Sequence, residues 1–461
     1  MLNKRPVDII SDLMALTSCG NTKNIILVAI ETKGRFDEDT FKSSVNEAVS
    51  IYPNYKSVLR EIHEGRTFYL AREYKPDMKI PIFSEPLAIS GSAGTTFEAV
   101  VSQLTTRFDR QWDLWGLPPL EIHILGIGEE RRVLAFVAHH VAGDATMAMR
   151  VITEVFGQYH ARMTGKAPSW TSNPYVLSTA KKRASTPKKS GWKGLFSQLK
   201  RNLADRKRKP QKPHGNGRRN DLREWHVERV ISVDETGRIL KSFSKDGLHV
   251  VDHLVACTNV ALDEWNTEQQ MEPGYISSVV TVNMRERFGG AEAQNYSSAI
   301  FFNSDPDQRN DYLEFVGSVA RARNKQLGRQ LDLSLRKSIA RGAKFFSLFP
   351  IGIRRKAARL FMDFQRHSVA VGYLGVVWPD FKDEKLGAGS SLERIGDSDI
   401  IDIHGTAYKQ AGTAYINLIA FIYRRQLHLV ISSTADLLTK EECYGFAEVF
   451  LKTVFHAAGF Q

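Results

Sequence analysis

The stretch Arg131-Arg-Val-Leu-Ala-Phe-Val-Ala-His-His-Val-Ala-Gly-Asp-Ala-Thr146 decides how we interpret this sequence. Its first part is an apolar run that ends at Ala138 and is typical of a buried strand. A helix is expected to begin near Asp144, because apolar residues then recur at helical spacing, at Met147, Val151, Val155 and Tyr159. Strand exits of this kind expose functional groups in α/β folds. The two histidines at this exit are therefore the first candidates for a site.

The histidine pair allows more than one interpretation. An imidazole such as that of His140 can act as a general base near neutral pH, since its ordinary pKa is about 6.5. A buried histidine bonded to the backbone would serve structure alone. Asp144 could simply cap the following helix. Zinc binding by His139 and His140 is disfavoured because no further Cys or His lies near them in the sequence, so we expect no metal.

Both halves of the chain alternate strand-like and helix-like segments, which predicts an α/β or α+β fold with mixed sheets. The expected strands cover 24–31, 120–125, 132–138, 276–282, 299–302, 368–377, 413–424 and 426–432. The clearest helical periodicity covers 38–51, 145–163, 249–265 and 439–458. His123, His253 and His404 lie in no motif, and we expect them to be ordinary packed residues.

The positive charge of the chain is concentrated in one segment. The 461 residues carry a formal charge of +12, but residues 181–220 alone hold 15 Lys and Arg against one acid. The other 421 residues sum to −2, so no basic surface for nucleic acid is expected in the folded body. Pro and Gly punctuate the segment, and we predict a linker at 181–220 between subdomains at 1–180 and 221–461.

Two basic segments are candidates for contact with an anionic membrane. In the linker, Trp192, Leu195, Phe196, Leu199 and Leu203 recur at helical spacing, which suits either a membrane surface or packing on the body. Residues 333–362 carry eight Lys and Arg and no acid around the apolar run 345–353. This second segment could dock in lipid headgroups or form a helix-turn-helix whose basic faces are wet.

Composition also restricts the compartment. Three cysteines in 461 residues cannot form a disulfide framework, and hydrophobic residues make up 42% of the chain, enough for a large core. Asp8 and Asp12 interrupt the N-terminal apolar run, so we expect no export signal and a cytoplasmic protein. No uncharged run is long enough to span a bilayer, so any membrane association should be peripheral.

The spacing His139-His140-x-x-x-Asp144 resembles the HHxxxDG signature of a superfamily of acyltransferases. Its members include chloramphenicol acetyltransferase, BAHD acyltransferases, nonribosomal peptide condensation domains and wax ester synthase/diacylglycerol acyltransferases. Ala145 stands where the signature has Gly, and Tyr373 replaces the Asn of a later "SNLG" segment. Residues 107–125 resemble the approach to the histidine strand, and residues 281–287 (Thr-Val-Asn-Met-Arg-Glu-Arg) resemble the "VNLRPR" strand.

The resemblance implies two chloramphenicol acetyltransferase-like subdomains in a V with a central tunnel. His140 would be the general base, and no acyl-enzyme would form. His139, Asp144 and Arg285 would support the site, with Asp144 and Arg285 paired across the two halves. Asn283, Asn295 and Gly143 are expected along the tunnel.

The main functional expectation is transfer of an acyl group from a thioester to a hydroxyl of a lipid-like acceptor. No bound cofactor is expected; acyl-CoA or an acyl carrier protein would be the co-substrate, and an alcohol or amine the acceptor. The alternative is a stand-alone condensation-type enzyme that forms an amide or ester from a carrier-bound donor. A second alternative is a non-catalytic module that binds membrane or RNA.

Overall fold

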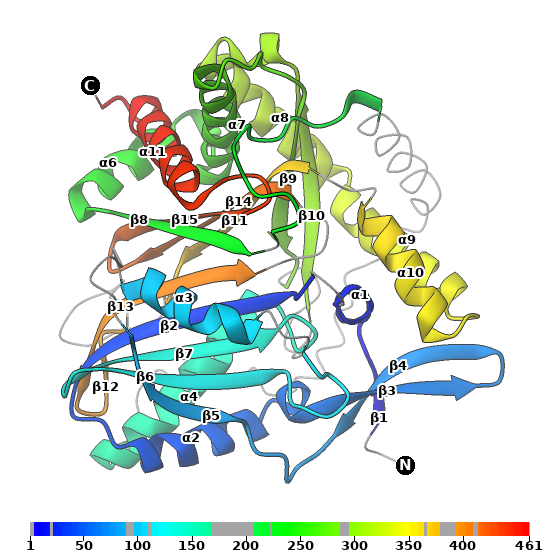
Figure 1. The fold of residues 1–461 in the computed structure, drawn as a ribbon, viewed down its shortest axis with the longest axis vertical. Helices are drawn as coiled ribbons and strands as arrows, with labels where there is room; N and C mark the ends of the chain where they lie inside the picture. The colour runs from blue at the N-terminus through cyan, green and yellow to red at the C-terminus, as the bar shows by residue number, and fades with distance from the viewer. Residues whose placement is uncertain are drawn as a thin grey trace.

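The computed structural model has two six-stranded sheets, each covered by helices, and a small third sheet (Figure 1). All eight strands and four helices expected from periodicity overlap observed elements. The structure describes residues 4–18, 22–88, 96–108, 112–166, 207–221, 223–285, 295–363, 367–378, 392–408 and 414–460.

The first sheet belongs mainly to the N-terminal half. Its strand order is β12 (Arg394–Ile395), β13 (Ser398–Tyr408), β2 (Ile25–Gly34), β7 (Arg131–His139), β6 (Leu120–Ile127) and β5 (Ile82–Pro86). The first eight residues of β2 and the last seven of β7 are all buried, as expected for central strands covered on both faces. Helices α2 (Glu38–Ser50) and α4 (Ala145–Thr164) pack together, while α3 (Thr96–Phe108) contacts β2.

The second sheet belongs to the C-terminal half. Its order is β10 (Ser297–Ser304), β9 (Ile276–Asn283), β11 (His367–Val376), β14 (Ala414–Tyr423), β15 (Gln426–Thr434) and β8 (Glu224–Ile231). Helices α6 (Val233–Phe243), α7 (Val250–Glu268), α8 (Tyr312–Gly328) and α11 (Lys440–Ala457) lie on the outer side of this sheet (Figure 1). Each half thus has its own apolar core, and the two sheets face each other.

One strand crosses between the halves. β13 pairs antiparallel with β2 from Ser398 opposite Gly34 to Tyr408 opposite Ile25. Without it, the apolar β2 would be an open sheet edge, and Ile400 and Ile403 would lose their buried places in the first core. Residues 394–408 of the expected C-terminal subdomain, 221–461, therefore belong to the first sheet.

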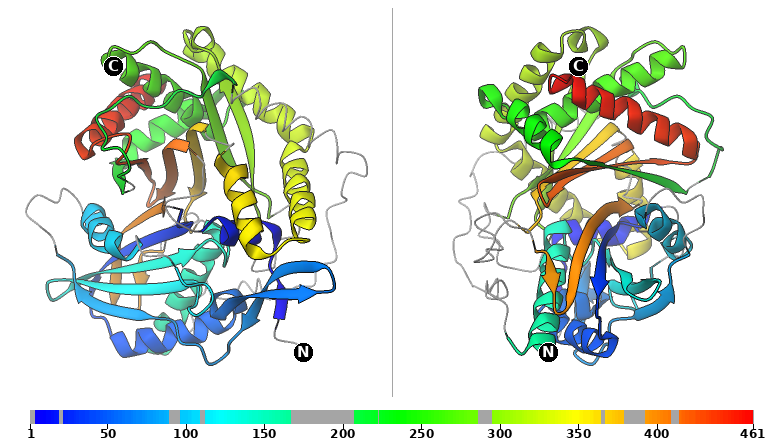
Figure 2. Two further views of the ribbon diagram at one scale, coloured as in Figure 1. Left: turned by 45° about the vertical axis from the view of Figure 1, so that its right-hand side comes forward. Right: turned by 90° about the vertical axis from the view of Figure 1, so that its left-hand side faces the viewer.

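A third region flanks the gap between the halves. The small sheet has the order β1 (Lys4–Pro6), β4 (Thr67–Tyr74) and β3 (Ser57–Glu64). Helix α1 (Ile9–Thr17) contacts both α9 (Leu331–Phe346) and α10 (Ile351–Asp363), which form a hairpin at one side of the molecule (Figures 1 and 2). Short 3-10 turns occupy η1 (Pro53–Lys56), η2 (Lys245–Gly247) and η4 (Pro306–Arg309).

The two basic segments have different outcomes. Residues 181–206 of the expected linker, with the helix expected around Trp192, lie outside the described residues. Residues 207–221 run along the C-terminal half, where the Gln211 backbone amide donates to the Tyr275 carbonyl oxygen at 2.7 Å. The segment 333–362 forms the helix-turn-helix that was one of the two expectations for it. Within the described ranges, no helix combines the length and hydropathy needed to span a membrane.

Candidate active site

His139 ends β7 and is held entirely by neighbouring protein groups. Its Nδ1 accepts the Val141 backbone N–H at 3.0 Å, so the neutral ring carries its proton on Nε2 and donates it to Ser18 Oγ at 2.8 Å. Ser18 in turn donates to the Met14 carbonyl oxygen at 2.6 Å. Burial, with His140 adjoining, lowers the pKa of His139 to about 3. Both ring nitrogens are used in structure, which suits the supporting role expected for His139.

His140 is placed differently, because its side chain borders a cavity. Its backbone N–H donates to the Asn24 carbonyl oxygen at 2.8 Å, which fixes the turn after β7. Burial lowers the pKa of His140 to about 4, although the Asp144 carboxylate and a hydrogen bond with the Gly143 backbone act in the opposite direction. The imidazole is therefore unprotonated at neutral pH, the form that can accept a proton.

Asp144 is the N-cap of α4 and the centre of a junction between the halves. Its Oδ1 accepts the Met147 backbone N–H at 3.0 Å. The expected pair with Arg285 is present: Arg285 Nη2 lies 2.8 Å from Oδ1 and 2.9 Å from Oδ2. The Tyr296 backbone N–H also donates to Oδ2, at 2.9 Å. These four hydrogen bonds hold the carboxylate in a structural position, and we assign it no role in proton transfer.

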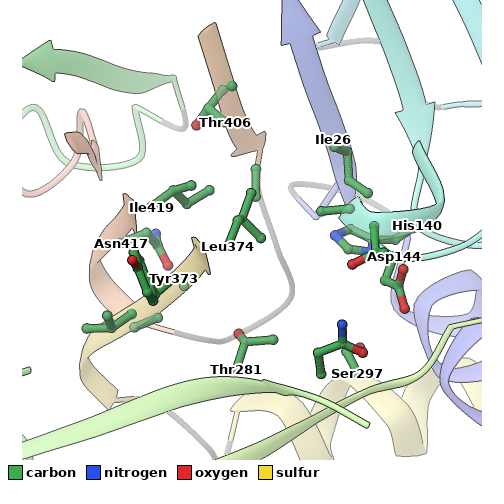
Figure 3. A pocket seen from close by; sticks show the side chains of 18 of the residues that line it. Ile26, His140, Asp144, Thr281, Ser297, Tyr373, Leu374, Thr406, Asn417 and Ile419 are labelled. Carbon is green, nitrogen blue, oxygen red and sulfur yellow. The ribbon is translucent and has the colours of Figure 1, made fainter. Parts of the chain in front are cut away.

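The cavity beside His140 has a volume of about 310 Å³ and lies between the two sheets. Its walls come from both halves, including β2, the first turn of α4, β9, β11, β13 and β14. Figure 3 places His140 and Asp144 on one side and Tyr373, Asn417 and Ile419 on the other. Most lining residues are apolar, and about a third are polar, with Thr281, Ser297, Tyr373, Thr406 and Asn417 among them. A pocket of this composition suits an apolar substrate oriented by a few hydrogen bonds.

The three residues expected along the tunnel have different positions. Asn283 lines the cavity, and its Oδ1 accepts the Arg285 backbone N–H at 2.9 Å. Asn295 and Gly143, also expected there, are not among the described residues that line the cavity. Asn295 is fully buried and accepts the Ser297 N–H at 3.1 Å, forming the turn before β10. Gly143 is packed so closely that an added Cβ would lie 2.8 Å from Met147 Cβ.

Sequence reasoning missed several residues that shape the site. Asn24 has a positive φ of 52° and donates through Nδ2 to Ser18 Oγ at 2.8 Å, so it supports both histidines. His404, expected to be an ordinary residue, borders the cavity from the crossing strand β13 and lies 2.6 Å from Glu228. No local pattern marks Asn24, Ser18 or His404, because each acts through a partner far away in the sequence. Nowhere in the described ranges do three His, Cys, Asp or Glu side chains converge as metal ligands.

The chain has similar proteins both among curated sequences and among solved structures. A curated relative, the probable non-canonical nonribosomal peptide synthetase CymA of Salinispora arenicola, is 22% identical over 147 residues. That match covers 32% of this chain and only 2% of the much longer synthetase.

Two solved structures share the fold over 99% of this chain. One is the TRI3 trichothecene 15-O-acetyltransferase of Fusarium sporotrichioides, with 94% of that chain covered, 11% identity and a TM-score of 0.70. The other is the first condensation domain of the calcium-dependent antibiotic synthetase in complex with a substrate analogue, with 96% covered, 14% identity and a TM-score of 0.68.

The family model named Condensation domain matches residues 19–280, more than half of the sequence and the part that contains both histidines, Asp144 and the start of the second sheet. The chain belongs to the condensation-domain family.

Proposed function

We propose that this protein is an acyltransferase in which His140 is the general base. The imidazole removes a proton from an acceptor hydroxyl or amine, and the oxygen or nitrogen forms a bond to a thioester carbonyl carbon. The C–S bond then breaks, and the imidazolium returns its proton to the leaving thiolate. The acyl group passes directly to the acceptor, so no protein nucleophile is needed.

The observation that carries this proposal is the position of His140. It is the imidazole of the motif, it is unprotonated at neutral pH, and it borders an apolar cavity built from both halves. Proton transfer in such a site proceeds with little competition from water. His139 is excluded as the base because Val141 and Ser18 occupy its two ring nitrogens.

Family membership favours a thioester carried by a carrier protein and the formation of an amide or ester. Similar proteins include a probable nonribosomal peptide synthetase, a condensation domain with a substrate analogue and an O-acetyltransferase. The other donor with the same acyl thioester group is free acyl-CoA.

A lipid-like hydroxyl acceptor is the second candidate, and the cavity lining favours it. Ile10, Leu13 and Met14 of α1 line the cavity, as do Val371, Leu374 and Phe421 of the second half. An unbranched or branched alkyl group would be buried against these side chains, while a strongly polar peptide acceptor would leave its amides without partners.

The direct test is turnover by a His140→Ala variant. Purified protein is incubated with a panel of acyl-CoAs and acyl carrier thioesters, with amines and a lipid extract as acceptors, and products are read by mass spectrometry. Loss of the general base should lower acyl transfer about 100-fold or more. His63→Ala, at an exposed histidine of β3, is the matched control and should retain full activity. Equal turnover by the His140→Ala and wild-type proteins would overturn the assignment.

A further inference from the structure

The outer faces of the α9–α10 hairpin carry large apolar side chains in solvent. Phe345 is 58% exposed and Leu348 is 49% exposed at the end of α9. Ile353 is 48% exposed and Leu360 is 59% exposed on α10. Phe345 also contacts the rings of Phe346 and Phe349, with centroid distances of 5.3 and 5.9 Å. A monomeric protein rarely leaves a cluster of this kind open unless it binds something.

Positive charges alternate with these apolar side chains. Arg341, Lys344 and Phe345 are exposed in the last turns of α9, and Leu348 is exposed in the turn that follows the helix. On α10, Ile353, Lys356 and Leu360 fall three or four residues apart and so share one helix face, and all three are exposed. No acidic residue occurs between 333 and 362. Glu61 of the neighbouring β3–β4 hairpin accepts the Ile351 backbone N–H at 2.8 Å.

The opposite face of α10 is firmly attached to the body. Arg354 Nη2 lies 2.9 Å from both carboxylate oxygens of Asp12 on α1, and this pair is buried. Ala358, one turn later, is also buried. The two sides of the hairpin are therefore distinct: one side is fixed by a buried ion pair, and the other presents apolar and cationic groups to solvent.

Helix α9 carries both cavity-lining and solvent-exposed apolar residues. Leu335 and Ile339 of α9 line the cavity together with Ile10 and Leu13 of α1. Phe345 follows Ile339 by six residues, or about 9 Å along the helix axis. An apolar molecule held at the outer face would thus lie close to the helices that border the cavity beside His140.

We propose that the outer face of the α9–α10 hairpin docks on an anionic lipid membrane. Phe345, Leu348, Ile353 and Leu360 enter the boundary between headgroups and acyl chains, and Lys344 and Lys356 lie at the level of the lipid phosphates. Alternation of large apolar side chains with cations fits this boundary better than it fits a protein partner, whose polar contacts would need acceptors in fixed positions. This docking is independent of the proposed reaction, since it requires no acyl transfer.

The test measures insertion at a single position, because residues 181–206 are also basic and could bind anionic vesicles by charge alone. Phe345→Trp is compared with Leu313→Trp, a control at a 74% exposed position on α8. Each is mixed with phosphatidylcholine vesicles containing phosphatidylglycerol and brominated lipid. The fluorescence of each variant is compared with that of the wild type, so that the difference reports the new tryptophan. On vesicles, the difference for position 345 should shift to the blue and be quenched, and the difference for position 313 should not change.

A second variant measures the contribution of the face to binding. Phe345, Leu348, Ile353 and Leu360 are all replaced by Ser, and far-ultraviolet circular dichroism checks that the fold is retained. The dissociation constant for the same vesicles at physiological salt should rise about tenfold or more, since four exposed apolar groups are removed. Unquenched fluorescence at position 345 would overturn the proposal, as would equal vesicle binding by the fourfold variant. If an acidic carrier protein shifts the fluorescence of the tryptophan at position 345 to the blue and brominated lipid does not quench it, this face is a protein interface instead.

Discussion

Among the polar contacts between the halves of this molecule, two junctions beside the cavity are built from different chemistry. At one, Asp144 of the first half pairs with Arg285 of the second at 2.8 Å. At the other, Glu228 on β8 lies 2.6 Å from His404 Nδ1 on the crossing strand β13 and 3.2 Å from His428 Nδ1 on β15. All five side chains are buried. Each junction contributes one residue to the lining of the cavity: Asp144, near His140, and His404, on β13.

The two junctions should respond differently to pH. A guanidinium keeps its charge throughout the range in which proteins fold, so the arginine junction stays a charged pair wherever the Asp144 carboxyl is ionised. Burial lowers the pKa of His404, but Glu228, together with Asp402 and Glu31, outweighs that effect and raises it. Burial raises the pKa of Glu228, but the opposite effect of His404 and His428 is larger and lowers this pKa to about 2. The arginine junction therefore fixes the active-site loop, and the histidine junction is the titratable one.

Breaking the arginine junction should have the largest effect. Arg285→Met leaves the buried Asp144 carboxylate without its cation, and removal of one partner of a buried pair costs about 3–5 kcal/mol. The free energy of unfolding, measured with urea, should fall by about that amount, and acyl transfer should fall as the loop that carries His140 shifts.

A double variant separates charge from packing at this junction. Asp144→Asn retains a good N-cap for α4 and removes the carboxylate charge. Combined with Arg285→Met, it should recover part of the stability lost in the single variant, because no unpaired buried charge remains. Strictly additive losses in the two single variants and the double variant would show that the pair is not coupled.

Breaking the histidine junction should have a smaller effect. Glu228→Gln removes the carboxylate but leaves histidines that can become neutral, so the loss is that of unsatisfied hydrogen bonds, about 1–3 kcal/mol. Urea unfolding of this variant is compared with that of Glu448→Gln, which removes a half-exposed carboxylate bonded to Arg229. A loss no greater than that of the control would show that Glu228 contributes little to joining the sheets.

The sharpest difference between the junctions should appear on raising the pH. Because the pKa of His404 is raised in the folded protein, its contribution to stability is complete below the unfolded value of about 6.5 and is lost as pH rises through the folded value. Between about pH 6 and about pH 9, the wild-type free energy of unfolding should fall more than that of His404→Gln. The difference should be of the order of 1 kcal/mol for each unit by which the pKa is raised. Parallel curves would contradict a charged His404.

The arginine junction could be anticipated from the sequence, and the histidine junction could not. Asp144 lies in a local motif whose spacing also predicts a helix start, and Arg285 matches a position of the resembling family. Glu228 and His428 lie on the paired strands β8 and β15, but His404 meets them only because β13 leaves its own half to pair with β2. A histidine in a strand has the same sequence pattern whether it packs alone or pairs across two sheets.

The same physical reason explains what was right and wrong about the cavity. Periodicity predicted the strands and helices that form its walls, because alternation and helical spacing are local properties. The turn at Asn295 and the tight packing at Gly143 depend on groups that meet only in the folded protein. The sequence therefore could not predict that these two residues lie outside the cavity lining. For the same reason, the sequence left two interpretations open for α9–α10, docking in lipid headgroups or a helix-turn-helix with solvated basic faces. Basic charge and apolar content can be counted in the sequence, but which side of the hairpin packs against α1 cannot.

The smallest effect is expected at Ala145, which adjoins Asp144 but makes no polar contact in the arginine junction. It is the first residue of α4 and borders the cavity, at a position where the HHxxxDG signature has Gly. Ala145→Gly removes one methyl group in the first helical turn and should cost less than about 1 kcal/mol of stability. Turnover should stay within about threefold of the wild type, since the hydrogen bonds that fix Asp144 and His140 are unchanged. Ala145→Leu, which extends into the cavity, is the matched control and should lower turnover by steric exclusion of substrate. A tenfold or larger gain in Ala145→Gly would instead show that this methyl group, and not the junction beside it, limits access to His140.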